Sequence, residues 1–179
     1  MTGQADPEIK RATVRDAEAL SLLATETFVE TFGHLYRHED LSTYLREEQS
    51  AEHYRQILQD PAVAIWLAIG ADGRPTGFIS AGPCKLPVPN QSEMAGEIRQ
   101  LYLRASAQGR GLGTRLLMVG LAWLQEHGHH PLYIGVWSGN GGAQRLYSRH
   151  GFAKIGEYDY PVGQHLDREF ILQRVRPPL

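Results

Sequence analysis

The stretch Gln108–Thr114, with the sequence QGRGLGT, combines residue types and spacing that predict anion binding. Residues 97–103 before it alternate apolar and polar side chains, which predicts a strand with one buried face. After it, apolar residues recur at helical spacing over 113–124. A glycine turn between a strand and a helix points unpaired backbone N–H groups and the positive end of the helix dipole at one spot. We therefore expect this turn to hold a pyrophosphate through its backbone.

The residues missing from this stretch exclude the common phosphate-binding loops. A dinucleotide fingerprint needs a third glycine, but the chain has Thr114 or Leu116 there, depending on the glycine from which the count starts. A Walker loop needs Gly-Lys-Ser/Thr, whereas Arg115 follows Thr114 and no lysine occurs between residues 109 and 128. The kinase motifs His-Arg-Asp and Asp-Phe-Gly are absent downstream. The pattern that remains is Gln-x-x-Gly-x-Gly.

A second pattern follows one helix and one strand later. Residues 132–137 predict a buried strand, and Asn140, Ala143, Tyr147 and Gly151-Phe152 come after it. Together with Gln-x-x-Gly-x-Gly, this Asn-x-x-Ala-x-x-x-Tyr-x-x-x-Gly-Phe pattern resembles the signature of the GCN5-related N-acetyltransferase (GNAT) superfamily. The resemblance extends over residues 9–174. It implies an α/β fold, with a mixed, mostly antiparallel sheet flanked by helices and a splayed central pair of strands.

Local signals predict the remaining elements. Thr13 and Asp16 have the spacing of a capping box before a helix that continues to about residue 32, and a helical region over 41–58 is broken near Gln49-Ser50. Strands are expected at 9–12, 62–69, 76–81, 153–160 and 168–174, and a proline-rich loop at 82–96. We expect the last two strands to be joined by a turn containing Pro161 and Gly163. Residues 1–8 are interpreted as a flexible tail, and residues 9–179 as a single N-acetyltransferase domain.

The resemblance implies that acetyl-coenzyme A (acetyl-CoA) is the cosubstrate and that no metal is needed. In the superfamily, the glycine turn holds the pyrophosphate, while the central strand and the asparagine bind the pantetheine arm. Carried over to this chain, the cofactor-binding residues are Leu101, Leu103, Gln108, Gly109, Arg110, Gly111, Leu112, Gly113, Thr114, Arg115, Asn140 and Tyr147. The alternative for Asn140 is a helix cap.

Acetyl transfer to an amine needs a neutral amine and a proton for the departing thiolate. An aliphatic amine has a pKa of about 10.4, so a group or a water chain must remove a proton at neutral pH. The resemblance implies that Glu97 works through water and that Tyr147 protonates the coenzyme A sulfur. The alternatives are a solvated or arginine-paired carboxylate at Glu97 and a packed aromatic ring at Tyr147.

The acceptor is predicted from weaker signals. Residues 28–32, Trp137 to Asn140 and Gly156-Glu157 resemble the bacterial spermidine/spermine N-acetyltransferase branch, which implies a polyamine or other small primary amine. Glu30, Phe32 and Trp137 are then the substrate-binding residues. Other outcomes left open are a protein or peptide amino group as acceptor, and a noncatalytic module that binds acyl-CoA.

Composition limits the partners and the cellular location that we expect for this protein. The chain has 179 residues and a net charge of −2, which provides no broad basic field, so we expect no nucleic-acid partner. No leader pattern or long apolar run occurs, so we expect a cytoplasmic protein without a membrane partner. The single Cys84 lies in a proline-rich loop and is expected to be inert, and the cluster His127, His129 and His130 is interpreted as a surface turn. The resemblance leaves a homodimer open.

Overall fold

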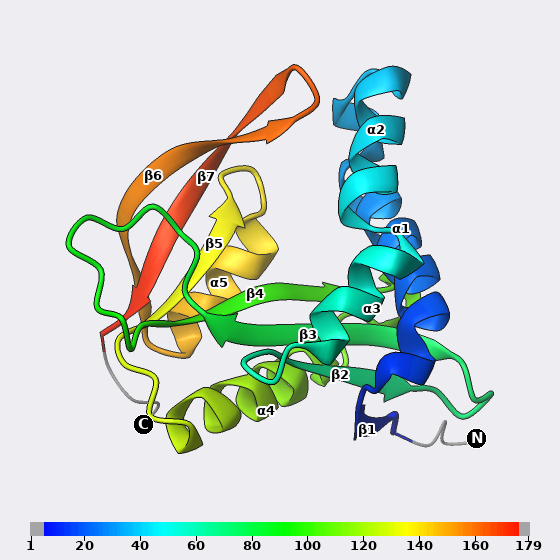
Figure 1. Ribbon diagram of the computed structural model, residues 1–179, viewed down its shortest axis with the longest axis horizontal. Helices are drawn as coiled ribbons and strands as arrows, with labels where there is room; N and C mark the ends of the chain where they lie inside the picture. Colours follow the sequence, from blue (N-terminus) through cyan, green and yellow to red (C-terminus); the bar gives the residue numbers. More distant parts are fainter. Residues whose placement is uncertain (1–5, 176–179) are drawn as a thin grey trace.

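The computed structural model describes residues 6–175 and contains an α/β fold built on a seven-stranded sheet. The strand order is β1-β2-β3-β4-β5-β7-β6, and the pairs are antiparallel except for β4 and β5 (Figure 1). The strands are β1 (Glu8–Arg11), β2 (Ala64–Ile69), β3 (Pro75–Pro83), β4 (Gly96–Leu103), β5 (Leu132–Trp137), β6 (Phe152–Val162) and β7 (His165–Arg174). The α-helices are α1 (Ala17–Phe32), α2 (His38–Glu48), α3 (Ala51–Gln59), α4 (Leu112–Glu126) and α5 (Gly141–Arg149), and the 3-10 turns are η1 (Val14–Asp16), η2 (Gly33–Leu35) and η3 (Ala105–Ala107).

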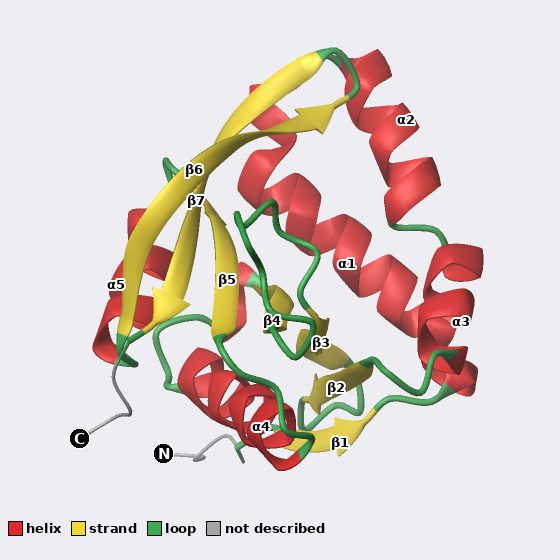
Figure 2. Ribbon diagram, turned by 60° about the vertical axis from the view of Figure 1, so that its left-hand side comes forward, coloured by secondary structure: helices red, strands yellow, loops and turns green. Residues whose placement is uncertain are grey.

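Helices cover both faces of the sheet at its central strands, so almost all side chains of β2 and most of those of β3 are buried. Helix α4 packs against β2, β3 and β4 on one face, where Leu117, Leu121 and Ile98 belong to one core. Helices α1 and α3 cover the other face, where Leu20, Leu23 and Phe78 belong to a second core (Figure 2). Fully burying one such side chain stabilises the fold by about 1.5–3 kcal/mol.

The central strands separate soon after they meet. Strand β4 pairs with β5 at three positions, from Gly96 opposite Leu132 to Ile98 opposite Ile134. Beyond Ile98 the two strands diverge, and the register between β3 and β4 skips Arg99, which is a β-bulge. Residues 99–103 of β4 therefore do not pair with residues 135–137 of β5. This confirms the prediction of a splayed central pair of strands.

The long hairpin of β6 and β7 curves away from the sheet toward α2 (Figure 2). Its tip is held by Asp40, whose Oδ1 accepts a hydrogen bond from the Gln164 N–H at 3.0 Å. Pro161 pairs with Leu166 inside the hairpin, so the prediction that Pro161 belongs to the turn is wrong. A proline fits there because β6 is an edge strand and its missing N–H leaves no ladder bond unmade.

Several other local predictions are confirmed. Asp16 Oδ2 accepts a hydrogen bond from the Thr13 N–H at 2.8 Å, although the capping box opens the short turn η1 before α1 begins at Ala17. Ser50 caps α3 by accepting a hydrogen bond from the His53 N–H at 3.2 Å. Strand β1 begins at Glu8, inside the predicted tail, and residues 1–5 of that tail lie outside the described residues.

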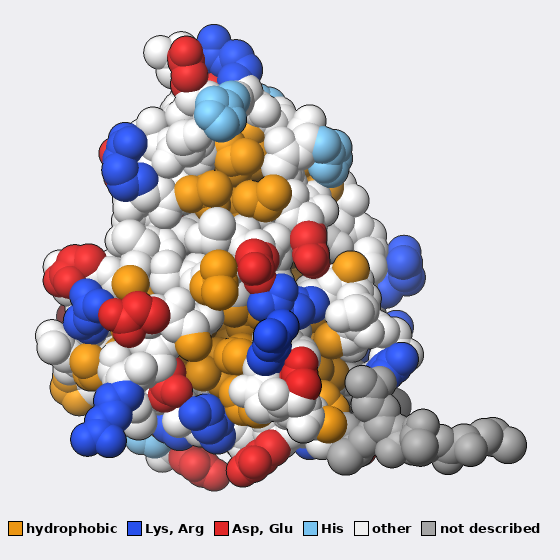
Figure 3. All heavy atoms as spheres, turned by 90° about the vertical axis from the view of Figure 1, so that its right-hand side faces the viewer, with side chains coloured by type: hydrophobic (Ala, Val, Ile, Leu, Met, Phe, Trp, Pro, Cys, Tyr) orange, Lys and Arg blue, Asp and Glu red, His pale blue; other side chains and the backbone are white. Residues whose placement is uncertain are grey.

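The surface over α1, α2 and α3 carries acidic and basic side chains in alternation (Figure 3). Some of them form ion pairs: Arg55 contacts Glu18 at 2.6 Å and Glu52 at 2.8 Å, and Lys10 contacts Asp16 at 3.0 Å. Exposed pairs of this kind contribute little to stability. Within residues 6–175, none of the helices has the length and apolar character needed to span a bilayer.

Candidate active site

The glycine turn forms the start of α4. Gly109 and Gly111 have φ values of +75° and +79°, which favour glycine, and a Cβ at either would point into open space. Gly111 is the residue before α4, so the N–H groups of residues 112–114 have no acceptor within the helix. The Gln108 side chain donates a hydrogen bond to the Leu103 carbonyl at 3.2 Å and ties the turn to the end of β4.

A cavity of about 480 Å³ lies over this turn, and we call it the loop cavity. Arg149 at the end of α5 and Thr31 of α1 lie on its wall, and neither was predicted from the sequence. Thr31 has no signal in the sequence, because α1 reaches the turn only through tertiary packing. The predicted cofactor-binding residues that line the loop cavity are Leu101, Leu103, Gln108, Gly109, Gly111, Gly113, Thr114, Asn140 and Tyr147.

The other three predicted cofactor-binding residues lie outside the lining of the loop cavity. Leu112 is 3% exposed and belongs to the core beneath the turn. Arg115 is exposed and its guanidinium donates a hydrogen bond to the Pro7 carbonyl at 3.0 Å, which holds the segment before β1. Arg110 does not line the cavity either.

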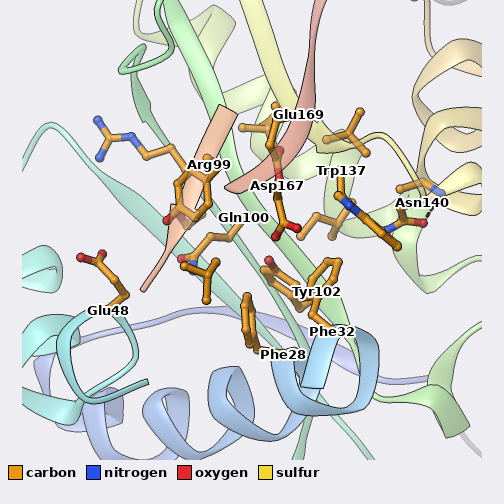
Figure 4. Close-up of a pocket in the computed structure, with 18 of the residues that line it drawn as sticks. Phe28, Phe32, Glu48, Arg99, Gln100, Tyr102, Trp137, Asn140, Asp167 and Glu169 are labelled. Carbon is orange, nitrogen blue, oxygen red and sulfur yellow. Dashed lines mark hydrogen bonds between the residues drawn. The ribbon is translucent and has the colours of Figure 1, made fainter. Parts of the chain in front are cut away.

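A second cavity, of about 340 Å³, lies on the opposite side of the splayed strands, and we call it the aromatic cavity. Residues of α1, α2 and α3 line one side of it, and residues of β3, β4, β5, β6, β7 and α5 line the rest (Figure 4). Its aromatic residues are Phe28, Phe32, Tyr36, Tyr44, His53, Tyr102, Trp137, Tyr147, Tyr158 and Tyr160, and its carboxyl groups belong to Glu48, Glu97, Asp167 and Glu169.

Strand register explains why these side chains share one face. Glu169 of β7 is the partner of Trp137 on β5 and of Tyr158 on β6, and Asp167 is the partner of Tyr160. Residues paired across neighbouring strands point to the same side of a sheet. The hairpin therefore presents two carboxyl groups and two phenols to the cavity in a single row.

The Glu97 carboxylate is held by the backbone. Its Oε2 accepts a hydrogen bond from the Lys85 N–H at 2.8 Å, and the side chain is 7% exposed. Burial raises the pKa of Glu97, while the Lys85 hydrogen bond and the positive charge of Arg99 oppose that increase. Arg99 itself donates a hydrogen bond to the Pro83 carbonyl at 2.6 Å.

Glu169 and Asp167 were not predicted from the sequence. Burial, with repulsion from the Asp167 charge, raises the pKa of Glu169 to about 7. Asp167 is 6% exposed and accepts hydrogen bonds from the Tyr36 hydroxyl and, at 3.1 Å, from His165 when its Nε2 is protonated. The alternation over residues 165–170 was the available signal, but it does not say which face is covered by helices.

Tyr147 lies between the two cavities. It lines both, together with Leu101, Tyr102, Asn140 and Ala143. Burial, and then the negative charge of Glu169, raise the pKa of the Tyr147 phenol. The phenol therefore stays protonated at neutral pH and can donate a hydrogen bond to an atom between the cavities.

The arrangement of one cavity over a glycine turn and another beyond a splayed strand pair agrees with the comparisons. The sequence profile described as "Acetyltransferase (GNAT) family" matches residues 26–152. The chain belongs to the GNAT family of acetyltransferases. An uncharacterized N-acetyltransferase of Lactobacillus delbrueckii subsp. lactis is 26% identical over 172 residues, which cover 93% of this chain and 96% of the relative.

Solved structures share the GNAT fold across nearly the whole chain. The PaiA N-acetyltransferase of Thermoplasma acidophilum, solved in complex with coenzyme A, has a TM-score of 0.75 at 21% identity and covers 95% of this chain and 99% of that one. The ribosomal-protein-alanine N-acetyltransferase of Brucella melitensis has a TM-score of 0.64 at 23% identity, covering 94% of this chain and 99% of that one. The predictions of family, fold and enzyme class are confirmed.

The residues predicted to bind the acceptor occupy different places in this GNAT fold. Phe32 and Trp137 meet edge to face in the aromatic cavity, with ring centroids 5.7 Å apart. Glu30 lies outside the lining of both cavities, is exposed, and accepts a hydrogen bond from the Ala105 N–H at 3.1 Å. The geometry thus favours Glu30 as a residue that holds η3, and its role as an amine ligand stays an untested prediction.

Asn140 acts as a cap in this structure. Its Oδ1 accepts a hydrogen bond from the Ala143 N–H at 3.0 Å at the start of α5 (Figure 4). The same side chain lines both cavities, so capping orients it at the point where they meet.

Cys84 and the histidine cluster lie outside the lining of both cavities, whereas His53 of α3 lines the aromatic cavity. Burial raises the pKa of the Cys84 thiol to about 11, so the thiol form predominates at neutral pH. His127 stacks on Trp123 with centroids 4.2 Å apart. In the described part of the chain, no three His, Cys, Asp or Glu side chains come together as a metal site.

Proposed function

We propose that this GNAT protein transfers the acetyl group of acetyl-CoA to a small primary amine by direct attack in a ternary complex. The observation that carries the proposal is the pair of cavities that meet at Tyr147. One is suited to a phosphate-bearing arm and the other to a cation, and a reacting carbonyl can lie between them. A polyamine is the first candidate acceptor.

The loop cavity fits acetyl-CoA. The positions that side chains would occupy at Gly109 and Gly111 are open, and the first turn of α4 supplies N–H groups to a pyrophosphate. The backbone N–H and C=O groups on the unpaired edges of β4 and β5 can form hydrogen bonds with the amides of a pantetheine arm. The coenzyme A complex of the Thermoplasma acidophilum structure supports this use of the fold.

The aromatic cavity fits a cationic amine. The four carboxyl groups of Glu48, Glu97, Asp167 and Glu169 outnumber the cationic side chains on its wall, which are those of Lys85 and Arg99. Aromatic faces attract ammonium groups, and the effect grows when both are shielded from water. Glu48 lies at the other side of the cavity from Asp167 and Glu169 (Figure 4), which suits an acceptor with more than one ammonium group.

The proton balance assigns the remaining roles. The acceptor ammonium loses one proton and its nitrogen attacks the thioester carbonyl carbon, so a C–N bond forms and the C–S bond breaks. The nitrogen loses a second proton, and the leaving thiolate gains one. Tyr147 is the proposed donor of that proton because it lines both cavities, and the raised pKa of the phenol makes complete transfer uphill. Glu97 stays a candidate for the other proton transfer.

A thiol-release assay tests the proposal. We expect coenzyme A to be released when the protein and acetyl-CoA are mixed with spermidine or with a shorter primary amine from a panel. Acetylation of peptide N-termini alone would replace the small-amine acceptor with a protein one. Tight acetyl-CoA binding with no release for any amine or peptide would identify a noncatalytic acyl-CoA-binding module. Cytoplasmic location and a homodimer stay predictions, which fractionation and light scattering can test.

A further inference from the structure

Glu169 is a carboxyl group in the aromatic cavity that the expected GNAT chemistry does not use. It lies on β7 between Trp137 and Tyr158, and Figure 4 shows it beside Asp167, across the cavity from Phe28 and Phe32. Its Oε2 lies close to the backbone of β5, because a Cβ built at Gly135 would be in ordinary contact with that oxygen at 3.7 Å.

Glu97 has a hydrogen-bond donor and a cationic neighbour, whereas Glu169 has neither among the described residues, and this difference favours Glu169 as the carboxylate that takes a proton from a cation. Glu97 is already bound by the Lys85 N–H and attracted by Arg99. Glu169 accepts no hydrogen bond from another residue in 6–175, and its charged neighbour is the like-charged Asp167. An incoming ammonium would supply the positive charge that the Glu169 environment lacks.

The tyrosines around Glu169 stay protonated, so they do not compete with it as proton acceptors. Phenols face it from the segment after α1, from β4, α5 and β6, and burial keeps them protonated. Those phenols belong to Tyr36, Tyr102, Tyr147, Tyr158 and Tyr160, and Glu97 faces the same space from β4. Glu169 and Tyr147 line the same cavity, so an amine bound at Glu169 shares that cavity with the predicted proton donor.

We propose that Glu169 is the general base that removes the proton from the acceptor ammonium, and that Asp167 is a positioning residue that holds a negative charge beside it. The inference rests on the proposed function. One N–H bond of the ammonium breaks, its proton passes to a Glu169 carboxylate oxygen and then to solvent, and the freed nitrogen lone pair forms the C–N bond. A pKa near 7 supports this role, because a base works best when its pKa is near the operating pH.

The test compares two amines and three glutamine variants. Glu169→Gln and Glu97→Gln remove one carboxylate each, and Glu157→Gln is the matched control on the exposed side of β6, where Glu157 pairs with Lys154 and Arg168. The kinetic parameters kcat and KM are measured from pH 5.5 to 9.5 with spermidine, or with the best amine of the panel. They are then measured with 2,2,2-trifluoroethylamine, which is largely neutral at pH 7.

We expect Glu169→Gln to lower kcat for the strongly basic amine at pH 7 on the order of 10²–10⁴-fold. The loss should shrink as the pH rises, because more of the amine is then neutral in solution, and it should be much smaller with trifluoroethylamine. Asp167→Asn should move the acidic limb of the wild-type profile to lower pH. Glu157→Gln should keep the wild-type profile.

Three results would overturn the inference. In the first, kcat of Glu169→Gln stays within about twofold of wild type across the pH range. In the second, KM rises alone, which would make Glu169 an ammonium anchor. In the third, Glu97→Gln, and not Glu169→Gln, removes the acidic limb.

Acetyl-CoA affinity by calorimetry and thermal melting show whether each variant folds. If Glu169→Gln fails to fold, the shift of the acidic limb in Asp167→Asn decides the matter. If the wild-type protein acetylates peptides but no small amine, the same pH test of Glu169 is made with the peptide as acceptor, and the same results decide it. A wild-type protein that acetylates nothing overturns the proposed function and the inference with it.

Discussion

At the residue scale, Tyr147 is where the two cavities meet, so its hydroxyl should matter to chemistry more than to binding. We expect Tyr147→Phe to lower kcat on the order of 10²–10⁴-fold, with little change in KM for acetyl-CoA, because the glycine turn, and not Tyr147, is the proposed site of the phosphate contacts. Steady-state kinetics under conditions where chemistry limits the rate provide the measurement.

Tyr133→Phe is the matched control for that experiment. Tyr133 is 5% exposed on β5 but lies outside both cavities, in a separate cluster with Leu86 and Ile171. The Tyr133→Phe variant should therefore keep the wild-type kcat. Equal kcat values for the two variants would reduce Tyr147 to a packing residue against Phe152.

At the element scale, a substitution in the first turn of α4 can distinguish the effect of an added side chain on folding from its effect on ligand binding. A Cβ at Gly113 would meet Leu103 and Leu146 at 3.4 and 3.5 Å, which are ordinary contacts, and alanine favours helix by up to about 1 kcal/mol over glycine. Gly113→Ala should therefore keep or raise the melting temperature and weaken acetyl-CoA binding by about tenfold or more, or ~1.4 kcal/mol.

Calorimetric titration with acetyl-CoA measures this loss. Gly141→Ala, in the first turn of α5 and outside both cavities, should leave affinity unchanged. Unchanged affinity in Gly113→Ala would place the pyrophosphate away from this turn.

The docking of the β6–β7 hairpin on α2 closes one end of the aromatic cavity. Gly163 has a φ of +59°, and a Cβ there would overlap the Asp40 carboxylate. We expect Gly163→Ala to destabilise the protein by about 1–3 kcal/mol and to raise KM for the amine more than KM for acetyl-CoA.

Gly73→Ala controls for backbone strain in that test. Gly73 has a φ of +78° in the β2–β3 turn with nothing within 4 Å, so the control carries strain without displacing a neighbour. Chemical denaturation and the two KM values provide the comparison. If both variants leave the amine KM unchanged, the hairpin does not shape the acceptor site.

At the scale of the whole molecule, the buried Glu169 makes stability depend on pH. Its pKa is about 7 in the folded protein against 4.5 for a free side chain, so the folded state binds more protons between these values. Stability is therefore highest below pH 4.5 with respect to this group, falls as the pH rises from 4.5 to about 7, and levels off above that. At 1.36 kcal/mol per pKa unit, the loss amounts to at most about 3 kcal/mol.

Urea unfolding of the wild-type and Glu169→Gln proteins at pH 5 and pH 8 tests this dependence. The wild-type protein should lose more stability than the variant between the two pH values, and other titrating groups cancel because both proteins contain them. Parallel pH dependences would mean that Glu169 ionises normally in the folded protein.

The sequence alone determined the family, the glycine turn, the asparagine and tyrosine of the second motif, and most of the elements. These features depend on local rules: glycine tolerates a positive φ at Gly109 and Gly111, and helical or strand periodicity is read over a few neighbours. The β6–β7 turn was misplaced because Pro161 signals a turn locally, while its position in an edge strand is a property of the whole sheet.

Tertiary structure alone decided the acceptor side of the site. Tyr36 and Asp167 are hydrogen-bonded although 131 residues separate them, and the strand order β5-β7-β6 places Glu169 next to Trp137. The resemblance of residues 28–32 to the spermidine/spermine branch predicted Glu30 as an amine ligand, which stays untested, and only the fold brings its carboxylate to the Ala105 N–H. A pocket lined by residues of five strands and four helices has no local signature, because which face of each element is covered depends on how all of them pack.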